Sequence, residues 1–245
     1  MSPTSPVALV TGASRGIGRA IAERLADDGF LVIVNYATDA AAAEGVVAAL
    51  HHRGAEAFPL RADVSDPAEV ERLFGEIRER FGQLRVVVHN AGVMPLAPIA
   101  PESIEAFDRA VAVNLRSTFL MMGHAGTALG SGGRFIALST SVLARNFPAY
   151  GPYIASKAGV EGLVRVFANE LRGRGITVNA VAPGPVATEL FFAGKTAEQI
   201  QHSAQLSPLE RLGEPADVAN AVAFLCGPDG GWVNAQVVRV NGGFA

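Results

Sequence analysis

A tyrosine and a lysine lie four residues apart, near the start of a segment with helical periodicity at 153–171. A four-residue spacing brings Tyr153 and Lys157 to the same face of a helix. The ordinary pKa of a phenol is about 10, so a tyrosine is a poor proton donor at neutral pH. A positive charge nearby, such as the lysine ammonium, lowers that pKa. The pair is therefore a candidate for general acid–base chemistry at a carbonyl oxygen, with an ordinary helix surface as the alternative.

A glycine-rich segment near the start of the chain has the pattern of a phosphate-binding turn. Residues 11–18 read Thr-Gly-Ala-Ser-Arg-Gly-Ile-Gly and follow an apolar run at 7–10. Glycines between a strand and a helix permit a tight turn, and they let backbone N–H groups approach a pyrophosphate at the helix N-terminus. A glycine-rich turn without a ligand is the alternative, but the position favours dinucleotide binding. The expected contacts are Gly12, Ser14, Arg15, Gly16, Ile17 and Gly18.

The end of the second expected strand discriminates between the two nicotinamide dinucleotides. It carries Asn35, Tyr36 and Ala37, and the first acid is Asp39. An acid at the strand end would bind the adenosine ribose and repel a 2′-phosphate. Its absence, together with Arg15 in the glycine loop, favours NADP(H) over NAD(H). Asn35, Tyr36 and Ala37 are then expected beside the ribose.

Two further short motifs close expected strands. Asp63 and Val64 follow a short third strand and are placed to meet the adenine. Asn90, Ala91 and Gly92 end the fourth strand, where small residues allow the backbone to approach a nucleotide closely. The Asn90 amide could instead tie neighbouring strands together.

The elements that must position these residues are short β-branched strands alternating with amphipathic helices. One helix is expected to end at Gly29, and two others begin at Asp66-Pro67 and Glu214-Pro215, where an N-cap or its equivalent precedes a proline. The 40–49 segment is an alanine-rich helix. The expected strands lie at 7–10, 30–34, 84–88, 134–138, 176–181 and 237–240, with a short one before Asp63.

This alternation predicts an α/β fold: a Rossmann-like, doubly wound parallel sheet with helices on both faces. We expect one domain over residues 1–245, with a flexible N-terminus at 1–6. The segment 186–207 has the weakest pattern and follows a Pro-Gly-Pro turn. Long loops in compact domains are often lids, so this segment is expected to be a substrate lid.

Composition excludes several classes of function. Lys and Arg total 20 against 23 Asp and Glu, so no global positive field is present to hold a nucleic acid or an anionic membrane. The single cysteine, Cys226, excludes an internal disulfide and a cysteine-based metal site, and is expected to be buried. No signal peptide or apolar run of membrane-spanning length is evident. We expect a cytoplasmic protein without a bound metal.

Together these motifs closely resemble the short-chain dehydrogenase/reductase family, from about Val7 to the end of the chain. Within that family the pattern is closest to 3-oxoacyl-carrier-protein reductases and to aldehyde or ketone reductases. The carriers of the resemblance are Thr11 to Gly18, Asp63-Val64, Asn90-Ala91-Gly92, Asn114, Tyr153 with Lys157, Pro183-Gly184 with Thr188, and Val240 to Phe244.

The resemblance implies a role for each matching residue. Tyr153 would be the general acid/base, while Lys157 would lower its pKa and hold the nicotinamide ribose. Asn114 would anchor a water molecule in a proton relay. Residues Pro183, Gly184, Val186 and Thr188 would run past the nicotinamide. The family also implies about seven strands and a homotetramer or homodimer.

The chain departs from the family where a serine usually binds the substrate oxygen. Counting thirteen residues back from Tyr153 leads to Thr140, with Ser139 and Ser141 on either side. Thr140 is slightly favoured over Ser141, which a one-residue loop change would bring into place. Near the C-terminus, Asn234 to Gln236 replaces the Thr-Gly-Gln that is common in the family.

Two hypotheses of different classes remain for the function. The leading one is an oxidoreductase that passes a hydride between NADP(H) and a carbonyl or alcohol, whether a ketone, an aldehyde or a 3-oxoacyl thioester. Met94, Phe147, Phe191 and Phe192 suggest a hydrophobic substrate, and basic residues at Arg165, Arg172 and Arg174 could meet an acidic carrier protein. The alternative is a nucleotide-binding regulatory or scaffold protein with little turnover, which would not need Asn114, Tyr153 and Lys157 together.

Overall fold

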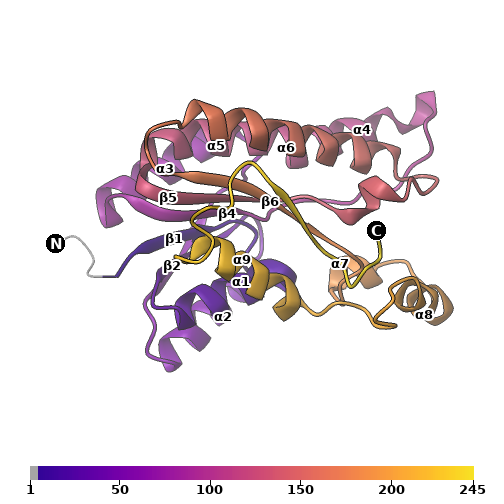
Figure 1. Ribbon diagram of the computed structural model, residues 1–245, viewed down its shortest axis with the longest axis horizontal. Coiled ribbons are helices and arrows are strands. Elements are labelled where there is room, and N and C mark those ends of the chain that lie inside the picture. The colour runs from indigo at the N-terminus through magenta and orange to yellow at the C-terminus, as the bar shows by residue number, and fades with distance from the viewer. Residues whose placement is uncertain (1–4) are drawn as a thin grey trace.

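A seven-stranded parallel sheet runs through the middle of the molecule (Figure 1). The computed structural model describes residues 5–245, so residues 1–4 of the N-terminal segment expected to be flexible lie outside it. The strand order is β3-β2-β1-β4-β5-β6-β7, and all neighbouring pairs are parallel. The predicted doubly wound α/β sheet is therefore confirmed. The strands are β1 (Val7–Val10), β2 (Leu31–Tyr36), β3 (Ala57–Arg61), β4 (Leu84–His89), β5 (Leu129–Leu138), β6 (Thr177–Pro183) and β7 (Val237–Val240).

Helices cover both faces of the sheet (Figure 1). One face carries α3 (Pro67–Phe81), α5 (Ser117–Ala128) and α6 (Gly151–Glu170), and the other carries α1 (Gly16–Asp27), α2 (Ala40–His52) and α9 (Pro215–Cys226). The remaining helices are α4 (Ile104–Ala110), α7 (Glu189–Phe192) and α8 (Ala197–Gln205), with short turns η1 (Pro101–Ser103), η2 (Val111–Arg116) and η3 (Ser141–Ala144). No helix within residues 5–245 is both long and apolar enough to cross a membrane.

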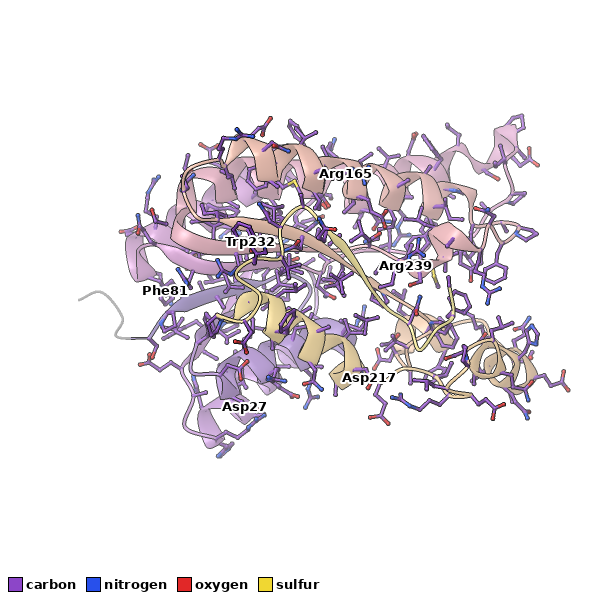
Figure 2. All side chains as sticks on the ribbon, viewed as in Figure 1. Asp27, Phe81, Arg165, Asp217, Trp232 and Arg239 are labelled. Carbon is purple, nitrogen blue, oxygen red and sulfur yellow. The ribbon has the colours of Figure 1, made fainter. Side chains whose placement is uncertain are left out.

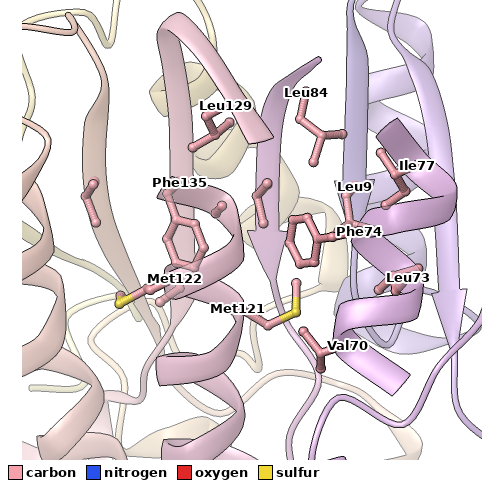
Figure 3. Packing of buried hydrophobic residues seen from close by; sticks show 14 of the residues in the cluster. Leu9, Val70, Leu73, Phe74, Ile77, Leu84, Met121, Met122, Leu129 and Phe135 are labelled. Carbon is pink, nitrogen blue, oxygen red and sulfur yellow. The ribbon is translucent and has the colours of Figure 1, made fainter. Parts of the chain in front are cut away.

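Two apolar layers form the core because the central strands are buried on both faces. Along β1, Leu9 points into the layer under α3 and α5, whereas Ala8 and Val10 point into the layer under α1 and α9. Figure 3 shows the first layer, where the fully buried Phe135 lies beside Met122, and Met121 lies beside Phe74. Side chains fill both layers from end to end of the sheet (Figure 2). Cys226 is buried in the second layer, as predicted.

The helix starts expected from proline and capping residues are present. Asp66 accepts hydrogen bonds from the backbone N–H groups of Ala68 and Glu69, and Pro67 is the first residue of α3. Helix α9 likewise begins at Pro215. Helix α1 ends at Asp27, just before Gly29, whose φ of +88° is in the left-handed region that favours glycine.

The segment 186–207 differs from the expected loop because it contains two short helices. Thr188 caps α7 by accepting from the N–H of Phe191. Thr196 and Gln199 form a reciprocal capping box at the start of α8. Both helices lie beyond the carboxyl ends of the strands, beside the C-terminus (Figure 1). Strand β5 also begins earlier than expected, at Leu129, through a glycine-rich stretch without an apolar pattern.

Candidate active site

The carboxyl ends of the strands border a cavity of about 720 Å³. It lies where ligands bind in open α/β sheets, near the point at which the strand order reverses between β1 and β4. Of the residues predicted to be catalytic, Thr140, Tyr153 and Lys157 line it. Of those predicted to bind the cofactor, it is lined by Ile17, Asn90, Gly92, Pro183, Gly184, Val186 and Thr188.

The glycine loop forms a cradle that only glycine can build. Gly12 and Gly16 have φ values of +61° and +55°. A Cβ on Gly18 would lie 2.3 Å from the carbonyl oxygen of Gly12 and 2.4 Å from Nδ2 of Asn90, so α1 packs directly against the loop and the end of β4. Free N–H groups at a helix N-terminus beside such a turn fit a pyrophosphate.

Asn90 holds this cradle together, which is the alternative that the sequence left open. Its Nδ2 donates to the carbonyl oxygens of Thr11 and Gly12, each at 3.0 Å. The Thr11 hydroxyl oxygen in turn accepts from the backbone N–H groups of Asn90 and Ala91. The end of β4 and the start of the glycine loop are thereby fixed to each other.

At the predicted adenosine end, the residues differ in what they can offer a ligand. Tyr36, the last residue of β2, is half-buried and Ala37 is exposed, and the first acid after them is Asp39. Asn35 is buried, and its Nδ2 donates to the carbonyl oxygens of Leu60 and Ala62. The Asn35 amide therefore ties β2 to β3, and the expected place of this residue beside the ribose stays a prediction.

The other residues predicted to contact the nucleotide lie in the glycine loop and in the turn after β3. Arg15 is exposed, and its guanidinium lies 3.5 Å from the carboxylate of Glu189 on α7. Ser14 is half-buried beside it. Asp63 accepts from the N–H and hydroxyl of Ser65, and Val64 is buried. These residues border the carboxyl ends of β1 and β3.

Tyr153 and Lys157 lie in the first two turns of α6, as their spacing predicted. Burial lowers the pKa of Lys157 to about 8, and its Nζ donates to the carbonyl oxygen of Leu138 at 2.6 Å. Burial raises the pKa of the Tyr153 phenol to about 12, although hydrogen bonding from Thr140 partly lowers it. The expected lowering of the tyrosine pKa is wrong for the protein alone, because desolvation of the phenolate outweighs its neighbours.

The three consecutive hydroxyls at the end of β5 have separate environments. Ser139 donates to the carboxylate of Glu161 on α6 at 2.7 Å. Ser141 is fully buried, donates to the carbonyl oxygen of Ala182 and accepts from the side chain of Asn241. The Thr140 hydroxyl accepts from the N–H of Val142 and faces the phenol of Tyr153. Of the three, Thr140 combines a place in the cavity lining with a hydroxyl directed at the tyrosine.

Asn114 is fully buried in the π-helical turn η2, between α4 and α5. Its Oδ1 accepts from the N–H of Val93, and its Nδ2 donates to the carbonyl oxygen of Val93 and to the hydroxyl of Ser156 on α6. A Cβ on Gly92 would lie 3.1 Å from Oδ1 of Asn114 and 3.5 Å from Nζ of Lys157. The turn therefore locks the end of β4 against the helix that carries the tyrosine and lysine.

Comparison with known proteins identifies this arrangement. A family model described as enoyl-(acyl carrier protein) reductase matches residues 12–245. A short-chain type dehydrogenase/reductase of Picea abies is 47% identical over 97% of this chain and 91% of that protein. The chain belongs to the short-chain dehydrogenase/reductase family.

Further relatives and solved structures agree over the full length. An NADPH-dependent aldehyde reductase-like chloroplastic protein of Arabidopsis thaliana is 44% identical over 97% of this chain and 93% of that protein. A dehydrogenase/reductase structure from Sinorhizobium meliloti 1021 superposes with a TM-score of 0.93 at 37% identity, covering 99% of this chain and 96% of that one. The angucycline C-6 ketoreductase LanV with bound NADP has a TM-score of 0.90 at 38% identity, covering 98% and 95%.

The wall of the cavity contains aromatic residues that sequence reasoning only partly found. Phe147 lies 5.8 Å from Tyr150 and 6.2 Å from Phe244, measured between ring centroids, and Tyr150 lies 6.4 Å from Tyr153. Phe191 joins them from α7, whereas the adjacent Phe192, expected in the lining, is outside it. The family motif at the end of the chain pointed to the segment of Phe244 without assigning it a role.

Basic residues that could have met a carrier protein lie away from this cavity. Arg165 is exposed on α6, as Figure 2 shows, and Arg172 follows the end of that helix. Arg174 donates to the carbonyl oxygens of Gly126 and Leu129. Arg172 and Arg174 precede β6, at the edge of the sheet opposite to the strand ends that line the cavity.

Proposed function

We propose that this short-chain dehydrogenase/reductase reduces a hydrophobic ketone or aldehyde to an alcohol with NADP(H). The observation that carries the proposal is the meeting of Thr140, Tyr153 and Lys157 in one cavity beside the glycine cradle. Each group has a chemical task at a carbonyl oxygen. The nicotinamide supplies the hydride.

Tyr153 is the proton donor in this reaction. With a pKa near 12, the phenol of Tyr153 carries its proton throughout the neutral range and can donate it to the oxyanion that forms during reduction. Thr140 supplies a second hydrogen bond to the same oxygen, which stabilises the developing charge. Lys157 keeps a positive charge near the phenol at pH values below about 8.

Preference for NADP(H) rests on charge at the adenosine end. The first acid after β2 is Asp39, whose carboxylate caps α2 by accepting from the N–H of Ala42. Arg15 offers an exposed guanidinium beside the glycine loop. The Arabidopsis relative is named NADPH-dependent, and LanV was solved with NADP. A 2′-phosphate would therefore meet no carboxylate at the end of β2, and it could bind Arg15 in place of the exposed Glu189 carboxylate.

The cavity favours a bulky aromatic or polycyclic carbonyl compound over a small aldehyde. The cavity of about 720 Å³ must hold the nicotinamide end of the cofactor as well as the substrate, so the chemistry of its wall is the better guide to the substrate. The rings of Phe147, Tyr150 and Phe244 form a continuous wall that leads to Tyr153, against which a flat molecule can stack. LanV is described as an angucycline C-6 ketoreductase, which agrees with a ketone as the reacting group.

The surroundings of the site complete the proposal. Helices α7 and α8 act as a substrate lid, since both contribute residues to the cavity wall. Exposed Ile104, Phe107, Phe119 and Val166 on α4, α5 and α6 support assembly into a homodimer or homotetramer. The single buried cysteine suits the reducing cytoplasm, which is the location we propose.

The test is a comparison of NADPH oxidation across ketones, aldehydes, quinones and acyl thioesters, with NADH as the control cofactor. We expect turnover with aromatic ketones or quinones and a preference for NADPH. Tight NADPH binding without turnover of any compound would favour the nucleotide-binding regulatory or scaffold protein instead.

A further inference from the structure

His89, the last residue of β4, is buried between the cofactor loop and the turn that carries Asn114. Only 3% of its surface is exposed, and it is not part of the cavity lining. Its Nδ1 lies 3.0 Å from the hydroxyl of Thr11, and its Nε2 lies 2.9 Å from the hydroxyl of Ser117 at the start of α5. The imidazole thus joins the start of the glycine loop to the start of α5.

The direction of this chain of hydrogen bonds follows from counting protons. The Thr11 oxygen already accepts from the N–H groups of Asn90 and Ala91, so its own proton goes to Nδ1 of His89. Nε2 must then carry the ring proton and donate it to the Ser117 oxygen. Ser117 passes its proton to the carbonyl oxygen of Val113. The imidazole is therefore neutral, with a single tautomer.

This series of hydrogen bonds ends on each side at backbone that belongs to the predicted site. At one end, Thr11 precedes Gly12 and fixes the first residues after β4. At the other end, Val113 directly precedes Asn114, whose own carbonyl oxygen accepts from the hydroxyl of Thr118. Three hydrogen bonds, Thr11–His89, His89–Ser117 and Ser117–Val113, therefore connect the Asn114 turn to the glycine loop, so a displacement of the turn would displace the loop.

We propose that His89 is a positioning residue that couples the nucleotide cradle to the Asn114 turn through the chain Thr11–His89–Ser117–Val113. This inference rests on the proposed function only for the identity of the nucleotide. Burial, together with the nearby Lys157 charge, lowers the pKa of His89 to about 3, so the neutral tautomer persists at every working pH. The link is thus permanent and does not act as a pH switch.

The coupling can be measured by NADPH binding in a two-by-two set of variants. Ser117→Ala removes the acceptor of Nε2 at a residue outside the cavity lining. In the parent protein it should weaken NADPH binding about fivefold, the scale of one hydrogen bond. In a His89→Asn background, where the chain is already broken, Ser117→Ala should change the Kd by less than about twofold.

A merely structural role predicts a different pattern. Ser117→Ala would then lower the Tm in both backgrounds without any background-dependent effect on the NADPH Kd. His51→Asn is the control, because the exposed His51 makes one hydrogen bond, to the carbonyl oxygen of Ala57, at the C-terminal end of α2. We expect it to lower the Tm and leave the Kd unchanged.

Equal effects of Ser117→Ala in both backgrounds, or no effect in either, would overturn the coupling. This result is distinguishable from failure of the proposed function. If the parent protein binds NADPH but reduces no carbonyl compound, the proposed activity is wrong, while the binding data still decide whether His89 couples the two segments.

Discussion

At the scale of single residues, the phenol of Tyr153 is the group whose removal should matter most. Tyr153→Phe deletes one oxygen from the ring, so we expect kcat to fall at least about a hundredfold, as for loss of a general acid. The NADPH Kd should stay within about twofold, because a single oxygen contributes little to binding. Tyr150→Phe is the control, since Tyr150 occupies the same wall with its ring centroid 6.4 Å away. Steady-state kinetics with comparable losses in both variants would refute the assignment.

The three hydroxyls at the end of β5 make a second test at this scale. Thr140→Val should lower kcat by on the order of a hundredfold, because a donor to the oxyanion is worth roughly 3 to 4 kcal/mol. Ser139→Ala should stay within a few fold of the parent, since that hydroxyl is bonded to Glu161. Ser141→Ala should lower the Tm and leave kcat within a few fold of the parent, because its buried hydroxyl donates to the carbonyl oxygen of Ala182. If Ser139→Ala or Ser141→Ala lost most of its kcat while Thr140→Val did not, that serine and not Thr140 would be the donor to the substrate oxygen.

The pH dependence of reduction should report the lysine. The pKa of Lys157 is lowered to about 8, so its ammonium is present below that pH and is lost as pH rises through it. We expect kcat/KM for the carbonyl substrate to be flat below about pH 8 and to fall above it. Tyr153, with a pKa near 12, does not titrate in this range. In Lys157→Met, kcat/KM should be lower at every pH and should no longer fall above about pH 8. If that fall persists, another group is responsible for it.

Residue types and spacing predicted which chemistry the site performs better than they predicted the direction in which individual side chains point. The Tyr153 and Lys157 pair follows from helix periodicity, which is local. The direction of the Asn35 amide and of the three hydroxyls depends on neighbouring strands, which are distant in the chain. The raised pKa of Tyr153 depends on burial, which spacing alone does not reveal.

At the scale of elements, the chain segment after β7 is held by several side-chain hydrogen bonds, and the one at Phe244 comes from Arg145. Nε of Arg145 donates to the carbonyl oxygen of Phe244 at 2.8 Å, and its guanidinium lies 4.8 Å from the centre of the Phe244 ring. Arg145→Gln should loosen this wall and raise KM for a bulky aromatic ketone about fivefold, from roughly 1 kcal/mol of lost contact. KM for a small aldehyde should not change.

Arg165→Gln, on the exposed face of α6, is the control for that comparison. Equal changes in KM for large and small substrates in Arg145→Gln would show that the contact acts on stability alone. The Tm of each variant separates the two effects, because a general loosening lowers it without discriminating between substrates.

Element boundaries were predictable where capping chemistry is strong. Asp66 with Pro67 placed the start of α3 correctly. The capping box of Thr196 and Gln199 carried the same kind of signal for α8, yet the weak apolar pattern of 186–207 suggested a loop. Short amphipathic helices over a cavity have few apolar positions, so periodicity underestimates them.

At the scale of the whole molecule, the alternation of strands and helices was sufficient to predict the doubly wound sheet and the edge at which the site lies. The crossover rule restricts such a chain to few topologies. The aromatic wall was not predictable as a unit, since Phe147, Phe191 and Phe244 come from three separate segments that only the folded sheet brings together. The aromatic wall of the cavity follows from that assembly.

Transfer of an isotopic label tests the central claim most directly. NADPH carrying deuterium in place of both hydrogens on the hydride-donating carbon of its nicotinamide ring is incubated with the protein and an aromatic ketone, and the alcohol is analysed by mass spectrometry. We predict deuterium at the carbinol carbon with the parent protein, and almost no labelled product with Tyr153→Phe. A protein that binds NADPH yet forms no labelled alcohol from any ketone, quinone, aldehyde or acyl thioester would contradict the proposed reductase activity.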